Sequence, residues 1–274
     1  MPRAIWTGTI SFGLVNVPIG LYSAVEEKQI RFHQMTKSGH RIRQKRVDEK
    51  TGREVDYDAL VKGYEKARGR VVLVEPEELE AAAPEQTRTI EIEYFVELAD
   101  IDPIYYNTTY YVAPRAGAGA DKAYVLLREA MRKSGRAAIG RFVMRTKQYL
   151  AVIRAKDELL MLETLYFADE IRDPKQLDIP KRVNLGAREL QIATQLIDSL
   201  TTEWDPKRYT DTYRAAVQKV IDRKAKGETI TVEEPKEQKG EVLDLVQALQ
   251  ASLDARTKGA KGRRPAKRTR RKAS

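Results

Sequence analysis

The chain has 274 residues and a formal net charge of +10, from 50 Lys and Arg against 40 Asp and Glu. A hydrophobic share of 42% indicates a folded chain, and the lack of cysteine excludes disulfides, thiolate metal sites and cysteine nucleophiles. Without a signal-peptide pattern or the roughly 18 to 20 apolar residues of a membrane span, we expect a soluble intracellular protein with a polyanionic partner.

The first third of the chain predicts short strands separated by turns. Residues 5–24 are apolar, β-branched and punctuated by glycine and proline, which predicts two strands. Further along, we expect strands at 29–34, 41–47 and 71–74 and a short helix at 56–64. A second helix is expected to begin at Pro76, because proline followed by acidic residues is typical of a helix start.

Residues 89–98 alternate apolar and acidic side chains, which predicts a half-buried strand. Its apolar face is expected to hold Ile90, Ile92, Tyr94, Val96 and Leu98. A strand pair is expected within 103–114, a helix at 120–134, and three strands within 137–155 and 159–167. Many short strands at this spacing predict a sheet closed into a barrel or sandwich, accompanied by helices.

From about residue 185 the apolar spacing becomes helical and predicts two amphipathic helices, broken near Trp204-Asp205-Pro206. Residues 227–240 are polar and predict a linker. A last short helix is expected to carry one apolar stripe, formed by Val242, Leu245, Val246, Leu249 and Leu253. The tail after it is expected to be disordered until it meets an anion.

The excess positive charge lies in the tail, because residues 256–274 hold ten Lys and Arg and no acid. Within the rest, residues 28–53 and 115–156 are strongly basic, and residues 75–102 hold ten acids against Arg88 alone. This sorting predicts basic stretches along one surface, with the acidic ones facing away. For the tail, it favours nucleic acid as the partner. For the inner stretches, the alternative is simply a solvated charged surface.

Motifs for nucleotide or zinc chemistry are incomplete. Residues 8–13 have the glycine spacing of a P-loop, but Leu14 and Val15 stand where Lys and Ser or Thr are required. His33 and His40 are the only histidines, and without cysteine they do not make a tetrahedral zinc site.

One metal site remains as an alternative. Asp100 and Asp102, together with Glu91 and Glu93, are candidates to hold a divalent metal for phosphodiester cleavage. The competing interpretation is a strand face followed by an Asp-Pro turn. The lysine motif of nucleotidyl transferases is absent.

Several motifs together resemble the bacterial Ku proteins. The longest is residues 4–18 followed by Leu21-Tyr22, and further matching stretches are 52–55, 61–65, 101–106 and 110–114. The resemblance covers essentially the whole chain. It implies a seven-stranded β-barrel with a bridge insertion, and two such chains forming a homodimeric ring threaded by a DNA end.

The same resemblance implies a function and a domain layout. It implies a non-enzymatic protein of double-strand break repair by end joining, cytoplasmic and nucleoid-associated, that recruits a multi-domain ATP-dependent DNA ligase of the ligase D type. Some relatives hold zinc in the bridge, but here we expect no metal and no cofactor because cysteine is absent. The expected parts are a core of 1–184 with a bridge at about 28–70, a dimerisation arm of 185–226, a linker and partner helix of 227–255, and a tail of 256–274.

A ring on a DNA end needs phosphate contacts, which give affinity without reading sequence. In the strand from residue 137, the alternation predicts Arg141, Arg145 and Lys147 on one face and Phe142 and Met144 on the other. The complete set of expected DNA contacts is Lys37, Arg41, Arg43, Lys45, Arg46 and Arg53 in the bridge, Arg141, Arg145 and Lys147 in the barrel, and Lys261, Arg263, Arg264, Lys267, Arg268, Arg270, Arg271 and Lys272 in the tail.

The arm and the last helix have their own expected partners. The arm is expected to pack against a second copy, with packing onto its own barrel as the alternative, through Leu196, Leu200, Tyr213, Val217 and Val220. The stripe from Val242 to Leu253 is expected to bind the ligase, with packing on the core as the alternative. A histone-like coating protein that binds DNA mainly through its tail remains a rival function.

Overall fold

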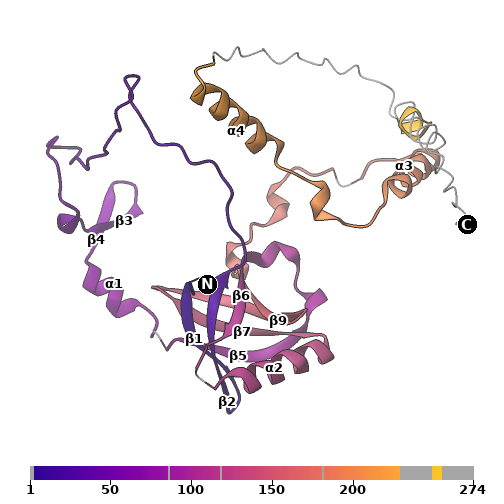
Figure 1. Cartoon of the computed structure of the whole chain (residues 1–274), viewed down its shortest axis with the longest axis horizontal. Coiled ribbons are helices and arrows are strands. Elements are labelled where there is room, and N and C mark those ends of the chain that lie inside the picture. The colour runs from indigo at the N-terminus through magenta and orange to yellow at the C-terminus, as the bar shows by residue number, and fades with distance from the viewer. Residues whose placement is uncertain (1–2, 86, 118, 181, 229–248, 255–274) are drawn as a thin grey trace, which may run out of the picture. The chain divides into compact units, whose positions relative to one another are not determined.

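The computed structural model describes residues 3–85, 87–117, 119–180, 182–228 and 249–254 (Figure 1). The chain divides into two compact units, Met1–Pro174 and Lys175–Ser274, and each is described by itself. Within the described ranges, no helix is long and apolar enough to cross a membrane.

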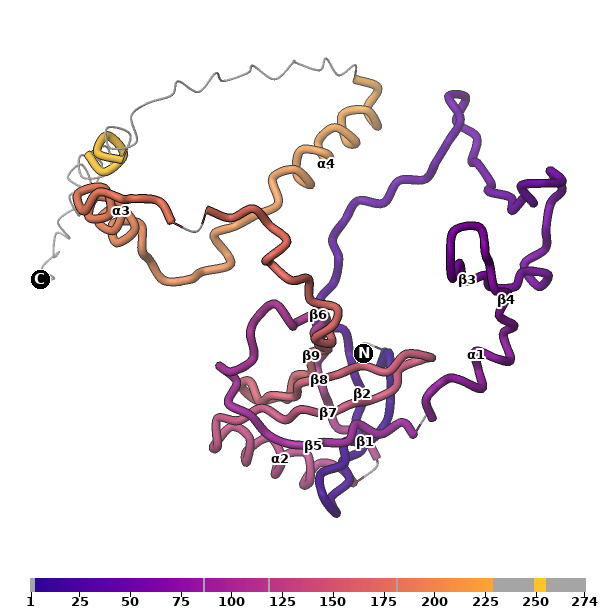
Figure 2. Tube along the Cα trace, turned by 180° about the vertical axis from the view of Figure 1, so that it is seen from behind, coloured from indigo at the N-terminus to yellow at the C-terminus, as the bar shows by residue number. Residues whose placement is uncertain are grey.

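Seven strands of the first unit form a closed barrel in the order β1-β2-β6-β9-β8-β7-β5 (Figures 1 and 2). Their bounds are β1 (Trp6–Phe12), β2 (Val15–Ser23), β5 (Thr89–Glu97), β6 (Tyr106–Pro114), β7 (Arg136–Met144), β8 (Lys147–Lys156) and β9 (Leu159–Leu165). All neighbours are antiparallel except β1 and β5, whose short parallel pairing at Thr9–Ser11 closes the barrel. The predicted mixed class and the implied seven-stranded barrel are both confirmed.

Two glycines allow β5 to lie close to its neighbours. A Cβ added to Gly8 of β1 would lie 2.3 Å from the carbonyl oxygen of Arg88, just before β5. A Cβ added to Gly140 of β7 would lie 2.3 Å from the carbonyl oxygen of Glu91. Neither position accepts a side chain unless the backbone moves. The glycine at position 8 therefore serves barrel closure rather than phosphate binding.

The predicted alternation of β5 is correct only in its first half. Ile90 is fully buried, but the pairing of β5 with β7 shifts register between Ile92 and Tyr94. As a result, Tyr94 is 54% exposed and Phe95 packs against the core instead. Such a bulge adds a residue to one strand and reverses the direction of the side chains that follow.

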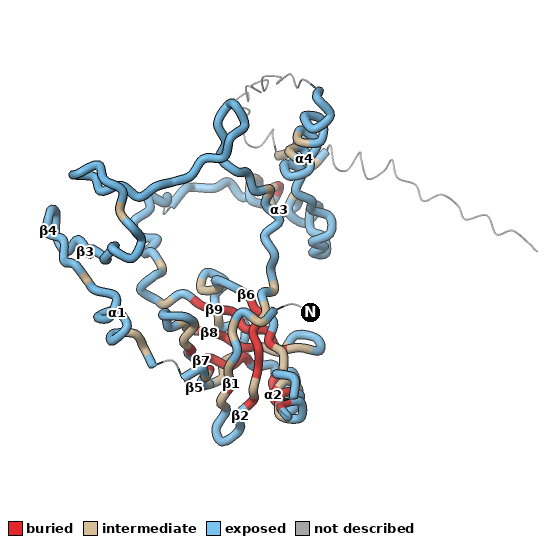
Figure 3. Tube along the Cα trace, turned by 60° about the vertical axis from the view of Figure 1, so that its left-hand side comes forward, coloured by how far each residue is buried: buried red, intermediate tan, exposed pale blue. Residues whose placement is uncertain are grey.

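The main core fills the barrel and extends to helix α2 (Asp121–Ser134), which contacts β2, β7 and β8. Buried residues, drawn in red in Figure 3, gather in the strands of the barrel. From α2 the core receives Tyr124, Leu127 and Met131. A smaller buried cluster is formed by Ala137, Ile139, Val152 and Leu165.

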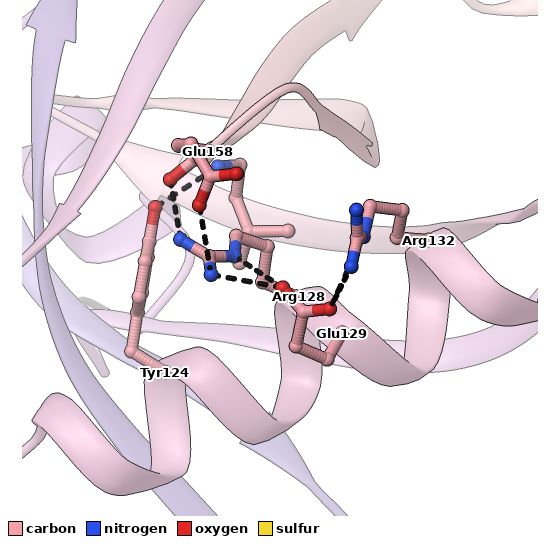
Figure 4. Close-up of polar contacts among 6 residues, drawn as sticks. Tyr124, Arg128, Glu129, Arg132 and Glu158 are labelled. Carbon is pink, nitrogen blue, oxygen red and sulfur yellow. Dashed lines mark hydrogen bonds and ion pairs between the residues drawn. The ribbon is translucent and has the colours of Figure 1, made fainter.

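Polar side chains fasten α2 to the strands (Figure 4). The hydroxyl of Tyr124 donates to the carbonyl of Val112 at 2.7 Å and accepts from the backbone N–H of Leu160 at 2.9 Å. Arg128 Nη1 donates to the carbonyl of Glu158 at 2.6 Å, and its Nη2 donates to Glu129 Oε1 at 2.8 Å. Burial raises the pKa of Tyr124, so ionisation of this phenol at alkaline pH opposes folding.

The bridge segment, residues 24–88, contains no buried residue among those described (Figure 3). The strands predicted at 29–34 and 41–47 are wrong, because the region has only the isolated pairs Met35↔Arg41 and Val47↔Glu54. The predicted helix at 56–64 is also wrong: a 3-10 turn η1 (Tyr57–Ala59) precedes strand β3 (Lys62–Ala67), which pairs with β4 (Arg70–Val74). Helix α1 (Pro76–Ala82) begins at the predicted proline.

Short 3-10 turns and two longer helices complete the described chain. One strand, rather than the predicted pair, occupies 103–114, because η2 (Leu98–Asp100) and η3 (Pro103–Tyr105) precede β6. After β9 come η4 (Ala168–Glu170) and η5 (Pro174–Gln176). The second unit holds α3 (Ala187–Leu200), η6 (Pro206–Arg208) and α4 (Thr212–Ala225), as the helical spacing predicted. Among its described residues, only Ile192 is buried.

Replacing Tyr124 with phenylalanine is expected to destabilise the barrel by about 1–3 kcal/mol, because the backbone groups of Val112 and Leu160 lose a buried partner. Urea unfolding at neutral pH measures the effect. The control is Tyr94→Phe, which removes a hydroxyl from a side chain that is 54% exposed and should change stability little. Equal stability of the two variants would contradict the role assigned to Tyr124.

Candidate nucleic-acid interface

Two tight turns shape the bridge segment, which carries six of the cations predicted to bind DNA. In the first, the N–H of Thr36 donates to the carbonyl of His40 at 2.8 Å, and Gly39 has a φ of +85°. In the second, the carboxylate of Asp48 accepts from the backbone N–H of Thr51 at 2.6 Å. Hydrogen bonds from the backbone and hydroxyl of Thr51 lower the pKa of Asp48. The chain thus reverses twice without a hydrophobic core.

The six bridge cations predicted to bind DNA are all exposed, but they differ in their neighbours. Lys45 forms an ion pair of 2.5 Å with Glu54, and the Arg46 guanidinium lies over the ring of Tyr57, 4.9 Å from its centroid. In the part of the chain that the structure describes, no carboxylate lies within ion-pair distance of the other four, Lys37, Arg41, Arg43 and Arg53. Those four present their full charge to solvent.

The turn between β7 and β8 carries a second group of cations. Arg145 occupies the left-handed region with a φ of +61°, which a two-residue hairpin turn requires. Lys147 lies opposite Met144, and its Nζ is 5.4 Å from the centroid of the Tyr149 ring. Residues that oppose each other across a ladder share a face. The prediction that Lys147 shares the face of Arg141 is therefore wrong, because the turn resets the alternation.

The predicted separation of basic and acidic faces is also wrong for β5 and β7. The acidic side chains of β5 lie beside the basic ones of β7, since the two strands are paired neighbours. Arg141 Nε lies 2.5 Å from Glu93 Oε1, and Arg136 Nε lies 3.2 Å from Glu97 Oε1. In both places along the β5–β7 pairing, opposite charges are paired rather than sorted.

The alternative metal site finds no support in the geometry. Within the described ranges, no group of three or more His, Asp or Glu side chains is placed to hold a metal ion. Asp102 instead caps η3, its carboxylate accepting from the N–H of Ile104 at 2.9 Å. The Asp-Pro turn is the correct interpretation of this stretch.

The arm residues predicted to contact a second copy lie on α3 and α4 and are only lightly covered within their own unit. Tyr213 is 79% exposed, Leu200 is 46% exposed and Val220 is 41% exposed, while Leu196 and Val217 are partly buried. Nothing in the described residues tests their predicted contacts, so these remain predictions.

Most of the predicted ligase-binding and tail residues lie outside the described residues. Leu249 and Leu253 are partly buried on a helical stretch, 249–254. The undescribed ones are Val242, Leu245, Val246, Lys261, Arg263, Arg264, Lys267, Arg268, Arg270, Arg271 and Lys272.

One set of exposed apolar side chains escaped the sequence analysis. The bridge segment exposes large apolar side chains, among them Phe32 at 72%, Tyr57 at 71%, Tyr64 at 68% and Leu73 at 64%. A two-stranded sheet such as β3–β4 is marginally stable alone. The sequence did contain one sign of this exposure. The segment has many apolar residues but is too short to bury them in a core of its own.

Comparisons with known proteins agree with one another over most of the chain. Residues 11–194 match the family model described as the Ku70/Ku80 beta-barrel domain. The protein named non-homologous end joining protein Ku 1 of Saccharopolyspora erythraea is 45% identical over 98% of this chain and 83% of its own length. The proteins named non-homologous end joining protein Ku of Anaeromyxobacter sp. (strain K) and Bacillus subtilis are 45% and 40% identical, over 100% and 92% of this chain and 93% and 82% of their own lengths.

The matched region contains every strand of the barrel from β2 to β9, the bridge segment and the cations at the β7–β8 turn. Each of the three relatives also extends over the second unit. The chain therefore belongs to the Ku family of non-homologous end joining proteins.

Proposed function

We propose that this chain binds the ends of double-stranded DNA, without sequence preference, in double-strand break repair by non-homologous end joining. The observation that carries the proposal is the bridge segment, in which Lys37, Arg41, Arg43 and Arg53 extend into solvent from a stretch with no buried residue among those described. Such a segment has side chains available for phosphates and no core that a ligand would disrupt. The relatives are named non-homologous end joining proteins, which supports a role in that repair process.

The proposed form is a homodimeric ring threaded by the duplex. Its support is the large exposed apolar surface of the bridge segment and of the arm, including Tyr64, Leu73 and Tyr213, which a second copy would cover. Phosphate contacts inside a ring give retention on the duplex without reading bases. The tail of 256–274, with ten cations, adds affinity that falls with salt.

The proposed partner is a multi-domain ATP-dependent DNA ligase of the ligase D type. Its dock is the apolar stripe from Val242 to Leu253, an arrangement in which an amphipathic helix presents anchors at every third or fourth residue to a groove. The polar residues 227–240 separate this stripe from the arm along the sequence.

A comparison of linear and covalently closed circular duplexes of equal length tests the threading mechanism. The linear duplex is expected to bind at least tenfold more tightly, because a ring enters only at an end. The mass of the free protein, measured in the same buffer, is expected to be that of two chains. Equal affinity for the circle would overturn threading and favour the coating role through the tail.

Replacing Arg145 with glycine is expected to weaken binding to linear duplex, because one cation near the phosphates is removed. The salt slope should fall by up to about 0.9, the amount that corresponds to one neutralised phosphate. Folding stability should be unchanged or slightly higher, since glycine accepts a φ of +61° without strain. The matched control is Asp157→Gly at the β8–β9 turn, where another non-glycine residue has a φ of +52°. The control relieves the same strain without removing a cation, so weaker binding in both variants would contradict a phosphate contact by Arg145.

The pair of substitutions Leu245→Asp and Leu249→Asp is expected to abolish stimulation of the ligase while leaving end binding intact. The control, Gln247→Asp with Ala251→Asp, adds the same charges at the same spacing on the opposite side of the helix. Measured end joining by ligase, with end binding in parallel, separates the two effects. Loss of end binding in the first pair would show that the stripe belongs to the fold.

A further inference from the structure

Two large aromatic side chains lie exposed in the second unit, in the connection between α3 and α4 (Figure 1). Trp204 is 77% exposed and Tyr209 is 70% exposed, although tryptophan in particular is highly buried on average. Their rings stack on each other, with centroids 5.6 Å apart and planes inclined by 26°. Since the pair covers only the facing sides of the two rings, most of each ring remains in solvent.

The turn that carries the rings is held by its own hydrogen bonds. Pro206 begins η6, and the carboxylate of Asp205 accepts from the backbone N–H of Lys207 at 3.0 Å. The N–H of Tyr209 donates to the carbonyl of Pro206 at 3.2 Å, which closes the turn between the two rings. None of residues 201–211 is buried. The local backbone therefore preorganises the pair, and the rings do not serve a core.

Two cations lie between the rings in the sequence. Lys207 and Arg208 are exposed, and in the part of the chain that the structure describes no carboxylate lies within ion-pair distance of either. Two of the three acids of this connection are engaged by the backbone. Asp205 caps η6, and Asp211 caps α4 by accepting from a backbone N–H of its first turn at 2.8 Å. Glu203, the third acid, precedes both rings.

Exposed aromatic rings beside unpaired cations are the combination that binds single-stranded nucleic acid. A base stacks on an aromatic ring while cations hold the adjoining phosphates, and because every base has a π-face the contact has little sequence preference. The bases of a duplex are already stacked on one another. A side-chain platform is therefore selective for bases that are unpaired.

We propose that Trp204 and Tyr209 form a stacking platform for unpaired bases of single-stranded DNA, with Lys207 and Arg208 contacting the adjoining phosphates. The source of the strand rests on the proposed function, because a double-strand break can leave a single-stranded overhang at the end that this chain binds. The platform gives an overhang a contact that a blunt end lacks.

A second copy of the chain is the competing occupant, since α3 and α4 are proposed to dimerise. The charges of the connection favour a polyanion instead. A second copy of the same turn would bring Lys207 and Arg208 against the same two cations, and like charges placed together oppose association.

Tryptophan emission tests the stacking directly, because the chain has two tryptophans and a base stacked on an indole quenches its emission. Adding a short oligothymidine to the full-length chain is expected to lower the emission. In Trp204→Phe the decrease should be lost, since the remaining emitter, Trp6, is part-buried in the barrel and donates to the carbonyl of Val143.

Unchanged emission in the unsubstituted chain, or an equal decrease in Trp204→Phe, would overturn the proposal. The probe has no duplex end, so this result does not depend on the proposed function.

Leucine and tyrosine at position 204 separate stacking from simple apolar contact. Trp204→Leu is expected to weaken binding to a duplex with a single-stranded overhang by about fivefold or more, the effect of losing one stacked base. Binding of the same variant to a blunt duplex of equal length should change by less than about twofold, because no unpaired base is present. Trp204→Tyr, the matched control, keeps a ring and should keep most of the affinity for the overhang.

Equal weakening by the leucine and tyrosine variants would overturn the platform, as would equal weakening of overhang and blunt duplexes by Trp204→Leu. A smaller mass of the free Trp204→Leu protein would show that the ring packs against a second copy and would also overturn it. Failure of the unsubstituted chain to bind blunt ends would contradict the proposed function, while the oligothymidine result would still decide the platform.

Discussion

Closure of the barrel through the pairing of β1 with β5 is the contact on which the rest of the structure depends. It is short and parallel, and it is the only junction that joins the first strand to one far along the chain. Gly8 makes it possible, because a side chain at this position would meet the carbonyl of Arg88, the residue before β5. Loop-closure entropy grows only logarithmically with length, so the long bridge segment between β2 and β5 adds little further cost.

Some charged side chains of this protein form ion pairs that stabilise the fold, and others are free to bind a ligand. On the barrel, Arg136 and Arg141 of β7 are satisfied by the acids of β5, and Arg128 ties α2 to the turn after β8. In the bridge segment, four cations extend into solvent without such partners among the described residues. Four cations of the bridge segment are therefore available to a ligand, whereas Arg136 and Arg141 are engaged by the fold.

The sequence predicted the barrel well, because its strands either bury one face, as the first half of β5 does, or bury consecutive residues, as β9 does, and so show an alternating or a continuously apolar pattern. The predicted strands at 29–34 and 41–47 and the predicted helix at 56–64 were wrong. These residues lie in the bridge segment, where no described side chain is buried, so their apolar spacing does not mark a buried face. The prediction also failed at two local irregularities. The bulge after Ile92 exposes Tyr94, and the turn at Arg145 places Lys147 beside Tyr149. The alternation of residues along a single strand cannot predict the bulge or the turn, because both depend on how two strands pair.

The candidate site was predicted in composition and only partly in geometry. Lys37, Arg41, Arg43 and Arg53 are as exposed as expected, whereas Arg141 and Lys45 proved to be ion-paired. Which cation meets which carboxylate depends on the strand order, and that order joins β5 to β7 across an intervening strand and helix. The pattern of charges along the chain does not show which strands are paired, so it cannot predict these ion pairs.

The exposed aromatic and aliphatic side chains of the bridge segment have a consequence for how this protein responds to its own concentration. The barrel is complete within one chain, so its melting temperature should not vary with protein concentration. The bridge segment, by contrast, has no buried residue among those described, and Phe32 and Tyr64 are 72% and 68% exposed. If a second copy covers these side chains, as proposed, dilution loosens the bridge segment by mass action before it unfolds the barrel, so the stability of the segment depends on protein concentration and that of the barrel does not.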